Sequence, residues 1–112
     1  MLENKSNKAF LEVKNVTLSR EKEISEFPDA VTARGKKHLV HLQEAIGKGY
    51  ESYLLFLIQR EDIKIMKIAD DIDLNYYNEI KKAKKFGVKI IAYSCKVNKN
   101  EISISNKIKV KI

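Results

Sequence analysis

The sequence predicts an α/β (α+β) fold, a mixed β-sheet with two helices, built as a single domain over residues 1–112. Two sets of patterns predict it. Helical periodicity covers 33–46 and 74–86, and strand patterns cover 9–18, 53–59, 88–95 and 101–112. The expected order is therefore β-α-β-α-β-β. A third observation is the length of 112 residues, which suits one modest core.

The first strand is expected at 9–18, where polar and apolar residues alternate. Glu12 and Lys14 fall on the same face of this strand because side chains repeat every two residues. The next segment, 19–27 (SREKEISEF), is polar and breaks the alternation, so we expect a mobile, solvated loop. Pro28 should end that loop before a helix.

Each predicted helix has a capping residue. Thr32 is the expected N-cap of the helix over 33–46, and Asp73 of the helix over 74–86. Gly47 and Gly49 should end the first helix, and Gly87 should end the second. The buried stripe of the first helix is Leu39, Leu42 and Ile46, and the inward face of the second is Ile80, Ala83 and either Tyr76 or Tyr77.

The remaining strands carry different patterns. Segment 53–59 (YLLFLIQ) is continuously apolar, which predicts a strand covered on both faces, and 88–95 (VKIIAYSC) is expected to be largely buried as well. The tail at 101–112 alternates apolar with polar residues. It predicts an antiparallel ribbon or an edge strand whose lysines discourage further pairing.

Composition narrows the class of protein. No apolar run approaches the roughly 20 residues that span a bilayer, and the start has no signal-peptide core, so we expect no membrane partner. The single cysteine, Cys95, predicts no disulfide partner and a cytoplasmic location. The net charge of +7 favours a polyanionic partner, most simply DNA. The alternative is the lysine-rich composition that AT-rich genomes produce.

The pair Glu12 and Lys14 carries the main chemical prediction. Two positions on a strand span about 6–7 Å on one face, so both side chains can reach one ligand. A carboxylate can hold Mg²⁺, and a neighbouring ammonium can orient water or stabilise charge on a phosphate. The alternative is a solvent-facing salt bridge.

The densest polar cluster is 27–38 (FPDAVTARGKKH), which carries the predicted nucleic-acid-binding residues. Arg34, Lys36 and Lys37 stand in the first turns of a helix, where backbone N–H groups favour a phosphate. Asp29 could add an acidic metal ligand if its loop folds back over the first strand. The alternative is an Asx-type turn at Asp29 beside a solvated basic face.

Three further side chains complete the candidate set. His38 should point towards phosphate or pack beside Ala45. The spacing of His38 and His41 is compatible with zinc, but no third ligand lies nearby in the sequence. Arg60 could reach the same cleft as a nucleic-acid contact, or could pair with Asp62 or Glu61.

EVKNVTL (12–18) followed by FPDAVTARGKKHL (27–39) resembles the sugar fermentation stimulation protein (SfsA) family. The resemblance continues through LLFLIQREDI (54–63), IDLNYYNEIKKA (72–83) and GVKIIAY (87–93), so it covers roughly residues 9–95. It implies a C-terminal domain similar to the PD-(D/E)xK nuclease fold. By that likeness Glu12 and Lys14 occupy the E-x-K positions as catalytic residues, and the Val13 carbonyl would face a metal.

The resemblance also implies what surrounds such a domain. In the family, an OB-like domain and an Asp-bearing strand precede the E-x-K strand, so this chain is similar to a member truncated at its N-terminus. His41 stands where a different residue is more usual.

Three hypotheses follow. The first is a DNA-binding regulator of sugar (maltose) metabolism with a vestigial or incomplete nuclease-type site. The second is a Mg²⁺-dependent DNA endonuclease that uses the E-x-K pair, and the third is a fragment that needs a partner segment or a homodimer.

Overall fold

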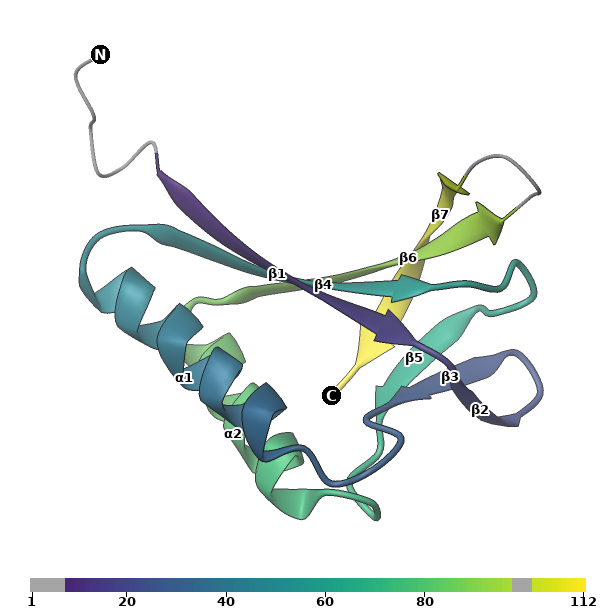
Figure 1. Cartoon of the computed structure of the whole chain (residues 1–112), viewed down its shortest axis with the longest axis horizontal. Coiled ribbons are helices and arrows are strands. Elements are labelled where there is room, and N and C mark those ends of the chain that lie inside the picture. Colours follow the sequence, from purple (N-terminus) through teal and green to yellow (C-terminus); the bar gives the residue numbers. More distant parts are fainter. Residues whose placement is uncertain (1–7, 98–101) are drawn as a thin grey trace.

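The computed structural model describes residues 8–97 and 102–112, which form a curled seven-stranded sheet and two helices (Figure 1). In chain order the elements are β1 (Ala9–Val16), β2 (Leu18–Glu21), β3 (Ile24–Phe27), α1 (Ala33–Gly47), β4 (Glu51–Ile58), β5 (Ile65–Ile68), α2 (Leu74–Phe86), β6 (Lys89–Val97) and β7 (Ile102–Lys111).

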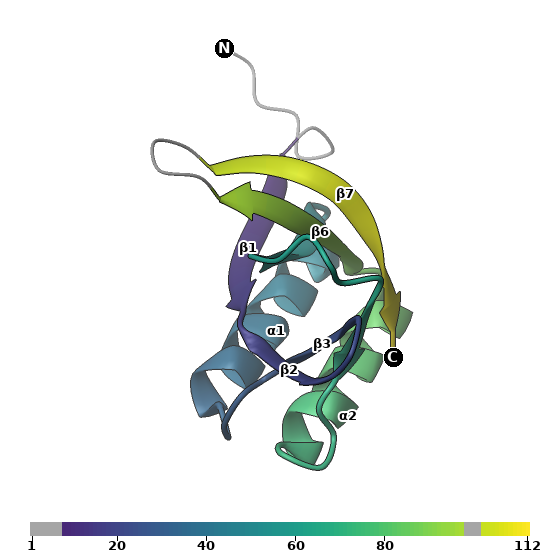
Figure 2. The same ribbon diagram turned by 90° about the vertical axis from the view of Figure 1, so that its right-hand side faces the viewer.

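The sheet is mixed, as predicted, with strand order β1-β4-β6-β7-β5-β3-β2. Strands β1, β4 and β6 run parallel to one another, and β7 is antiparallel to β6. On its other side β7 runs parallel to β5, which is parallel to β3, and β2 closes the order as an antiparallel partner of β3. The sheet curls so strongly that β7 arches over the helices in the turned view (Figure 2).

Both helices lie side by side against the same face of the sheet (Figures 1 and 2). The predicted caps are confirmed. The Thr32 side chain accepts from the Gly35 N–H at 2.9 Å, and the Asp73 side chain accepts from the Tyr76 N–H at 3.0 Å. Gly87, with φ of +119°, ends α2 in the left-handed conformation that glycine tolerates.

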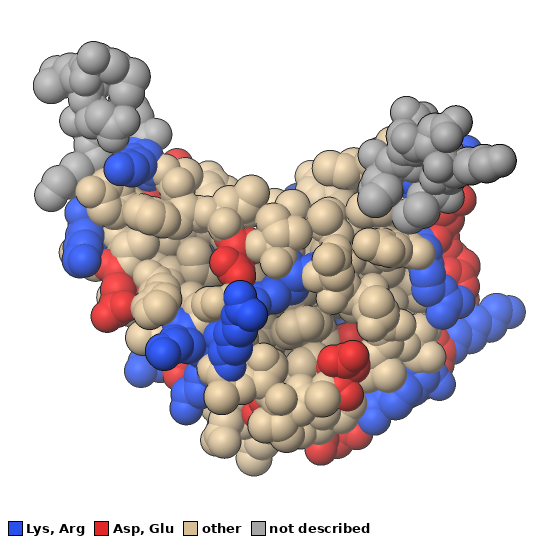
Figure 3. Space-filling model, viewed as in Figure 1, with Lys and Arg blue, Asp and Glu red and all other residues tan. Residues whose placement is uncertain are grey.

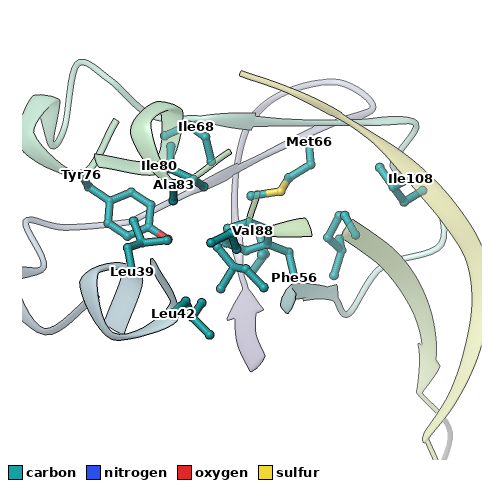
Figure 4. Close-up of a cluster of buried hydrophobic side chains, with 14 of the residues drawn as sticks. Leu39, Leu42, Phe56, Met66, Ile68, Tyr76, Ile80, Ala83, Val88 and Ile108 are labelled. Carbon is teal, nitrogen blue, oxygen red and sulfur yellow. The ribbon is translucent and has the colours of Figure 1, made fainter. Parts of the chain in front are cut away.

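The hydrophobic core fills the space between the helices and the sheet (Figure 4). Of the two tyrosines considered for the inward face of α2, Tyr76 is fully buried and Tyr77 is only partly buried. The other large buried side chains come from α1, α2 and the central strands: Leu39, Leu54, Phe56, Ile58, Met66 and Ile80.

The prediction of a mobile loop at 19–27 is wrong, because this segment forms the hairpin β2–β3. Glu23 turns the chain with φ of +66°, and Glu26 is buried although it is charged. The Arg20 guanidinium holds both Glu26 oxygens, at 2.8 and 2.7 Å, so the carboxylate is paired inside the strand. β3 then extends the sheet by pairing with β5, an element that the sequence patterns did not predict.

Two other expectations about strands are corrected. In β4, Leu54, Phe56 and Ile58 are buried while Leu55 and Leu57 are only half-buried, so this strand is fully covered on one face alone. Of the two alternatives for the tail, the antiparallel ribbon is confirmed, because β7 pairs antiparallel with β6. The edge strand is wrong, because β7 lies between β6 and β5; residue 101 of that prediction is outside the described part. The edges of the sheet are β1 and β2.

Candidate functional site

Glu12 and Lys14 of β1 meet His38 of α1 in a closed triangle. The Lys14 Nζ lies 3.3 Å from the Glu12 Oε1 and 2.7 Å from the His38 Nδ1. The same His38 nitrogen lies 2.9 Å from the Glu12 Oε1. We call these three residues the E-K-H cluster. The sequence predicted that the acid and the amine share a face, and the structure adds His38 as their common partner.

The local fold explains this meeting. Strand alternation turns Glu12 and Lys14 towards α1. Because Leu39 and Leu42 anchor α1 in the core, the adjoining positions His38 and His41 lie beside β1. A cleft of about 420 Å³ opens between the two elements, and it is lined by Phe10, Leu11, Glu12, His38, His41 and Tyr50 among others.

A single nitrogen of His38 serves two neighbours that need opposite roles from it. The Nδ1 can accept from the Lys14 ammonium when it carries a lone pair, or donate to the Glu12 carboxylate when it carries a proton. Burial lowers the pKa of His38, and the charge of Lys14 lowers it further, while Glu12 acts in the opposite direction. The neutral ring that accepts from Lys14 is therefore favoured at neutral pH.

The members of the E-K-H cluster differ in their access to solvent. The Lys14 side chain is 15% exposed and the Glu12 side chain is 31% exposed. The Glu12 side chain is therefore the more accessible of the two charged side chains. In this resting arrangement all three polar groups are paired with one another, so a ligand must displace at least one of these contacts.

Tyr76 of α2 packs closely against Gly35 in the first turn of α1, a contact that the sequence analysis did not predict. The Tyr76 hydroxyl is buried without a hydrogen-bond partner among the described residues. Burial raises the pKa of Tyr76, and the charges of Asp73 and Glu12 add to that effect. A Cβ at Gly35 would lie 3.0 Å from the Tyr76 ring. A glycine inside the first turn of a predicted helix was the signal for such a close approach.

The predicted basic residues lie together at the start of α1. Arg34, Lys36 and Lys37 are exposed, and the first turn of α1 contains no acidic residue. They line a shallow surface hollow with Val40 and His41. Figure 3 shows Lys and Arg side chains gathered over the α1 region on this face. Arg34 stands four residues before His38 in α1, so the basic first turn adjoins the E-K-H cluster, and the charge of Arg34 contributes to the lowered pKa of His38.

The other two predicted site residues, Arg60 and Asp29, stand on segments of the chain outside β1 and α1. Arg60 follows β4 and forms a two-pronged pair with Asp62, at 2.9 and 2.6 Å. Asp29 is exposed in the connection between β3 and α1. Among the residues that the structure describes, no group of three or more His, Cys, Asp or Glu side chains could hold a metal ion, so Asp29 does not join Glu12 in such a group.

Two expectations about partners can also be compared with the structure. Cys95 is a free, buried thiol, and burial raises its pKa. Neither helix in the described ranges is long and apolar enough to cross a bilayer.

Comparisons with known proteins agree with the resemblance found in the sequence. The profile of the "Sugar fermentation stimulation protein RE domain" matches residues 1–101. A sugar fermentation stimulation protein homolog of Pelagibacter ubique is 56% identical over 110 residues, which are 98% of this chain and 47% of that protein. A homolog of Agrobacterium fabrum is 44% identical over 91% of this chain and 43% of its own length.

The solved structure of SfsA from Pyrococcus furiosus in complex with Ca²⁺ superimposes with a TM-score of 0.83 at 25% identity. The match covers 91% of this chain and 44% of that one, so the chain spans a little under half the length of the relatives that it matches. The mixed sheet, its two helices and the sequence matches support one conclusion. The chain belongs to the sugar fermentation stimulation protein (SfsA) family.

Proposed function

We propose that this chain binds duplex DNA through the basic first turn of α1, and that the adjoining E-K-H cluster is an incomplete nuclease-type site. One observation carries the proposal. Three exposed cations, Arg34, Lys36 and Lys37, occupy a helix start that has no acidic residue, beside the cluster. These cations oppose the helix dipole, so helix stability does not account for them.

A DNA phosphate would relieve this unfavourable arrangement. The N-terminal end of a helix favours an anion, and Lys or Arg side chains next to it add direct charge contacts. The net charge of +7 supplies a long-range attraction of the same sign. These three residues would contact the phosphates of the DNA backbone and not the bases. We therefore expect binding that depends strongly on salt and shows little sequence preference.

Fluorescence anisotropy with a labelled duplex tests the proposal. Replacement of Arg34, Lys36 and Lys37 by alanine should weaken binding and flatten its salt dependence, by about 0.9 in the logarithmic slope for each lost phosphate contact.

The matched control carries the same loss of charge on α2, where Lys81, Lys82 and Lys85 are also exposed. This control should bind nearly as the unchanged protein does. Equal loss in both triple variants would contradict a localised site, because it would mean that net charge alone attracts DNA.

The biological role that we propose is regulation of sugar (maltose) metabolism through this DNA binding. The relatives are named for the stimulation of sugar fermentation, which supports a link to sugar use. The chain covers less than half of the length of those relatives. The proposed role therefore requires that the domain shared with them be the part that binds DNA.

Magnesium-dependent cleavage of DNA is the second candidate, and the contact between Glu12 and Lys14 favours it. The donor set does not fit Mg²⁺ within one chain, however. The described residues offer one carboxylate and one imidazole in the cluster, whereas Mg²⁺ prefers several oxygen ligands.

A cleavage assay decides between the two candidates. Supercoiled DNA incubated with Mg²⁺ and the unchanged protein should be cut no faster than with Glu12→Ala or Lys14→Ala. Cleavage that both substitutions abolish would establish the endonuclease and overturn the view of an incomplete site.

A further inference from the structure

The hydroxyl group of Tyr76 is buried in the core, and no side chain or backbone group within residues 8–97 and 102–112 forms a hydrogen bond with it. Figure 4 shows the ring of Tyr76 among the other core side chains. A phenylalanine would fill the same space without this hydroxyl, and a buried hydroxyl that lacks a partner lowers the free energy of unfolding. The Tyr76 hydroxyl therefore requires a partner that the direct contacts do not supply.

The partner of this hydroxyl must be small and enclosed. The described residues already shield the Tyr76 Oη from solvent almost completely, so a further segment of protein could not reach it. A water molecule is small enough to be enclosed. Buried waters typically make about three hydrogen bonds to polar groups of this kind.

Tyr76 lies close to the E-K-H cluster. Its ring packs against Gly35, and His38 follows Gly35 by three residues on α1, so the two positions are neighbours on the helix surface. Burial raises the pKa of Tyr76, and the carboxylates of Asp73 and Glu12 add to that effect. Both carboxylates therefore act on the hydroxyl.

The two carboxylates differ in their free oxygen atoms. In Asp73 each oxygen accepts from a backbone N–H at the start of a helix, at 3.0 and 2.9 Å. In Glu12, by contrast, both contacts with the described part of the chain use Oε1, which lies 3.3 Å from the Lys14 Nζ and 2.9 Å from the His38 Nδ1. The Glu12 Oε2 can thus accept a hydrogen bond from another donor.

We propose that Tyr76 is a positioning residue for Glu12. Its hydroxyl donates to one enclosed water, and this water donates in turn to the Glu12 Oε2. The link holds the carboxylate from its buried side, while Lys14 and His38 hold Oε1. The importance of the link for DNA chemistry rests on the proposed function, whereas the link itself is tested without DNA.

A double-mutant cycle in urea denaturation tests the link. Tyr76→Phe removes only the hydroxyl, and it should lower the denaturation midpoint of the otherwise unchanged protein, because a hydrogen-bonded path to a charged group is lost. In the Glu12→Ala background the acceptor is already absent. There, Tyr76→Phe should leave the midpoint unchanged or raise it.

Tyr77→Phe is the matched control, because Tyr77 is only partly buried and its ring centre lies 5.1 Å from the Lys81 Nζ. Its effect should be the same with and without Glu12→Ala. Equal losses for Tyr76→Phe in both backgrounds would overturn the proposal, because the hydroxyl would then act without Glu12. A Tyr76→Phe protein at least as stable as the unchanged one would overturn it as well.

A high-resolution crystal structure of the unchanged chain gives a second test that does not require any variant to fold. The proposal predicts a water within about 3 Å of both the Tyr76 Oη and the Glu12 Oε2. A direct hydrogen bond from this hydroxyl to a protein group, or no water between the two atoms, would overturn it. DNA binding that survives loss of the α1 cations would contradict the proposed function alone, because neither the cycle nor this water involves DNA.

Discussion

At the scale of single residues, His38 joins the functional candidates on β1 to the basic first turn of α1. Its ring is partly buried, and it contacts both Lys14 and Glu12 through one nitrogen. Burial and the nearby cation of Lys14 together lower the pKa of His38, and the Glu12 carboxylate only partly offsets them.

The pKa of His38 therefore predicts opposite responses to two substitutions, measured by NMR titration of the ring protons. Lys14→Met removes a positive neighbour and should raise the pKa of His38, whereas Glu12→Gln removes a negative neighbour and should lower it further. Shifts of the same sign in both variants would show that His38 does not contact this pair.

The same lowered pKa has a consequence for folding. The unfolded chain binds a proton at His38 near the ordinary value of about 6.5, above the folded value. The unfolded state thus takes up more protons as the pH falls through that value, and the contribution of His38 to stability declines. Urea denaturation at a series of pH values should show a smaller decline in His38→Gln than in the unchanged protein.

Gly35 is a residue at which a single added methyl group should destabilise the fold. A Cβ there would lie 2.9 Å from the Thr32 Cγ2 and 3.0 Å from the Tyr76 ring. Gly35→Ala should therefore destabilise the fold by roughly 1–3 kcal/mol in urea denaturation, as crowding in a packed interior does.

Gly47→Ala is the control for this prediction, because nothing lies within 4 Å of a Cβ at that position. It should be neutral or slightly stabilising, since alanine exceeds glycine in helix propensity. A Gly35→Ala protein as stable as Gly47→Ala would mean that Tyr76 does not pack closely against α1.

At the scale of elements, Asp73 ties the starts of the two helices together. One carboxylate oxygen caps α2 at the Tyr76 N–H, and the other accepts from the Thr32 N–H at 2.9 Å, just before α1. Asp73→Ala removes both contacts and should lower the free energy of unfolding by about 1–3 kcal/mol.

Asp73→Asn separates the two contacts of this side chain, because the amide oxygen can still cap α2 whereas the NH2 group cannot accept from the Thr32 N–H. The loss for Asp73→Asn should be clearly smaller than for Asp73→Ala. Equal losses would mean that hydrogen bonding at the cap contributes little.

The elements that were predicted correctly are those whose signals are local. Thr32, Asp73 and Gly87 begin or end helices through contacts with residues a few positions away. The hairpin β2–β3 was missed because it depends on contacts with distant segments: β3 pairs with β5, and Arg20 is shared between Glu26 of the hairpin and a distant carboxylate. Arg20 pairs with Asp71, which is 51 residues further along the chain, and no local pattern reveals that contact.

At the scale of the whole molecule, the sheet order explains what the sequence could not predict about the site. The shared face of Glu12 and Lys14 followed from strand alternation alone. The contact of His38 with Glu12 requires that α1 pack beside β1. The place of β1 in the sheet depends on how the seven described strands pair. Both depend on long-range packing rather than on residue spacing.

The central claim is that DNA phosphates bind where the basic first turn of α1 meets the E-K-H cluster. NMR titration of the labelled protein with a short duplex tests it most directly. The account predicts that amide signals of 33–38 and 12–14 shift at low salt, return as salt is added, and leave α2 unchanged. Shifts confined to α2 or to the β6–β7 hairpin would contradict it.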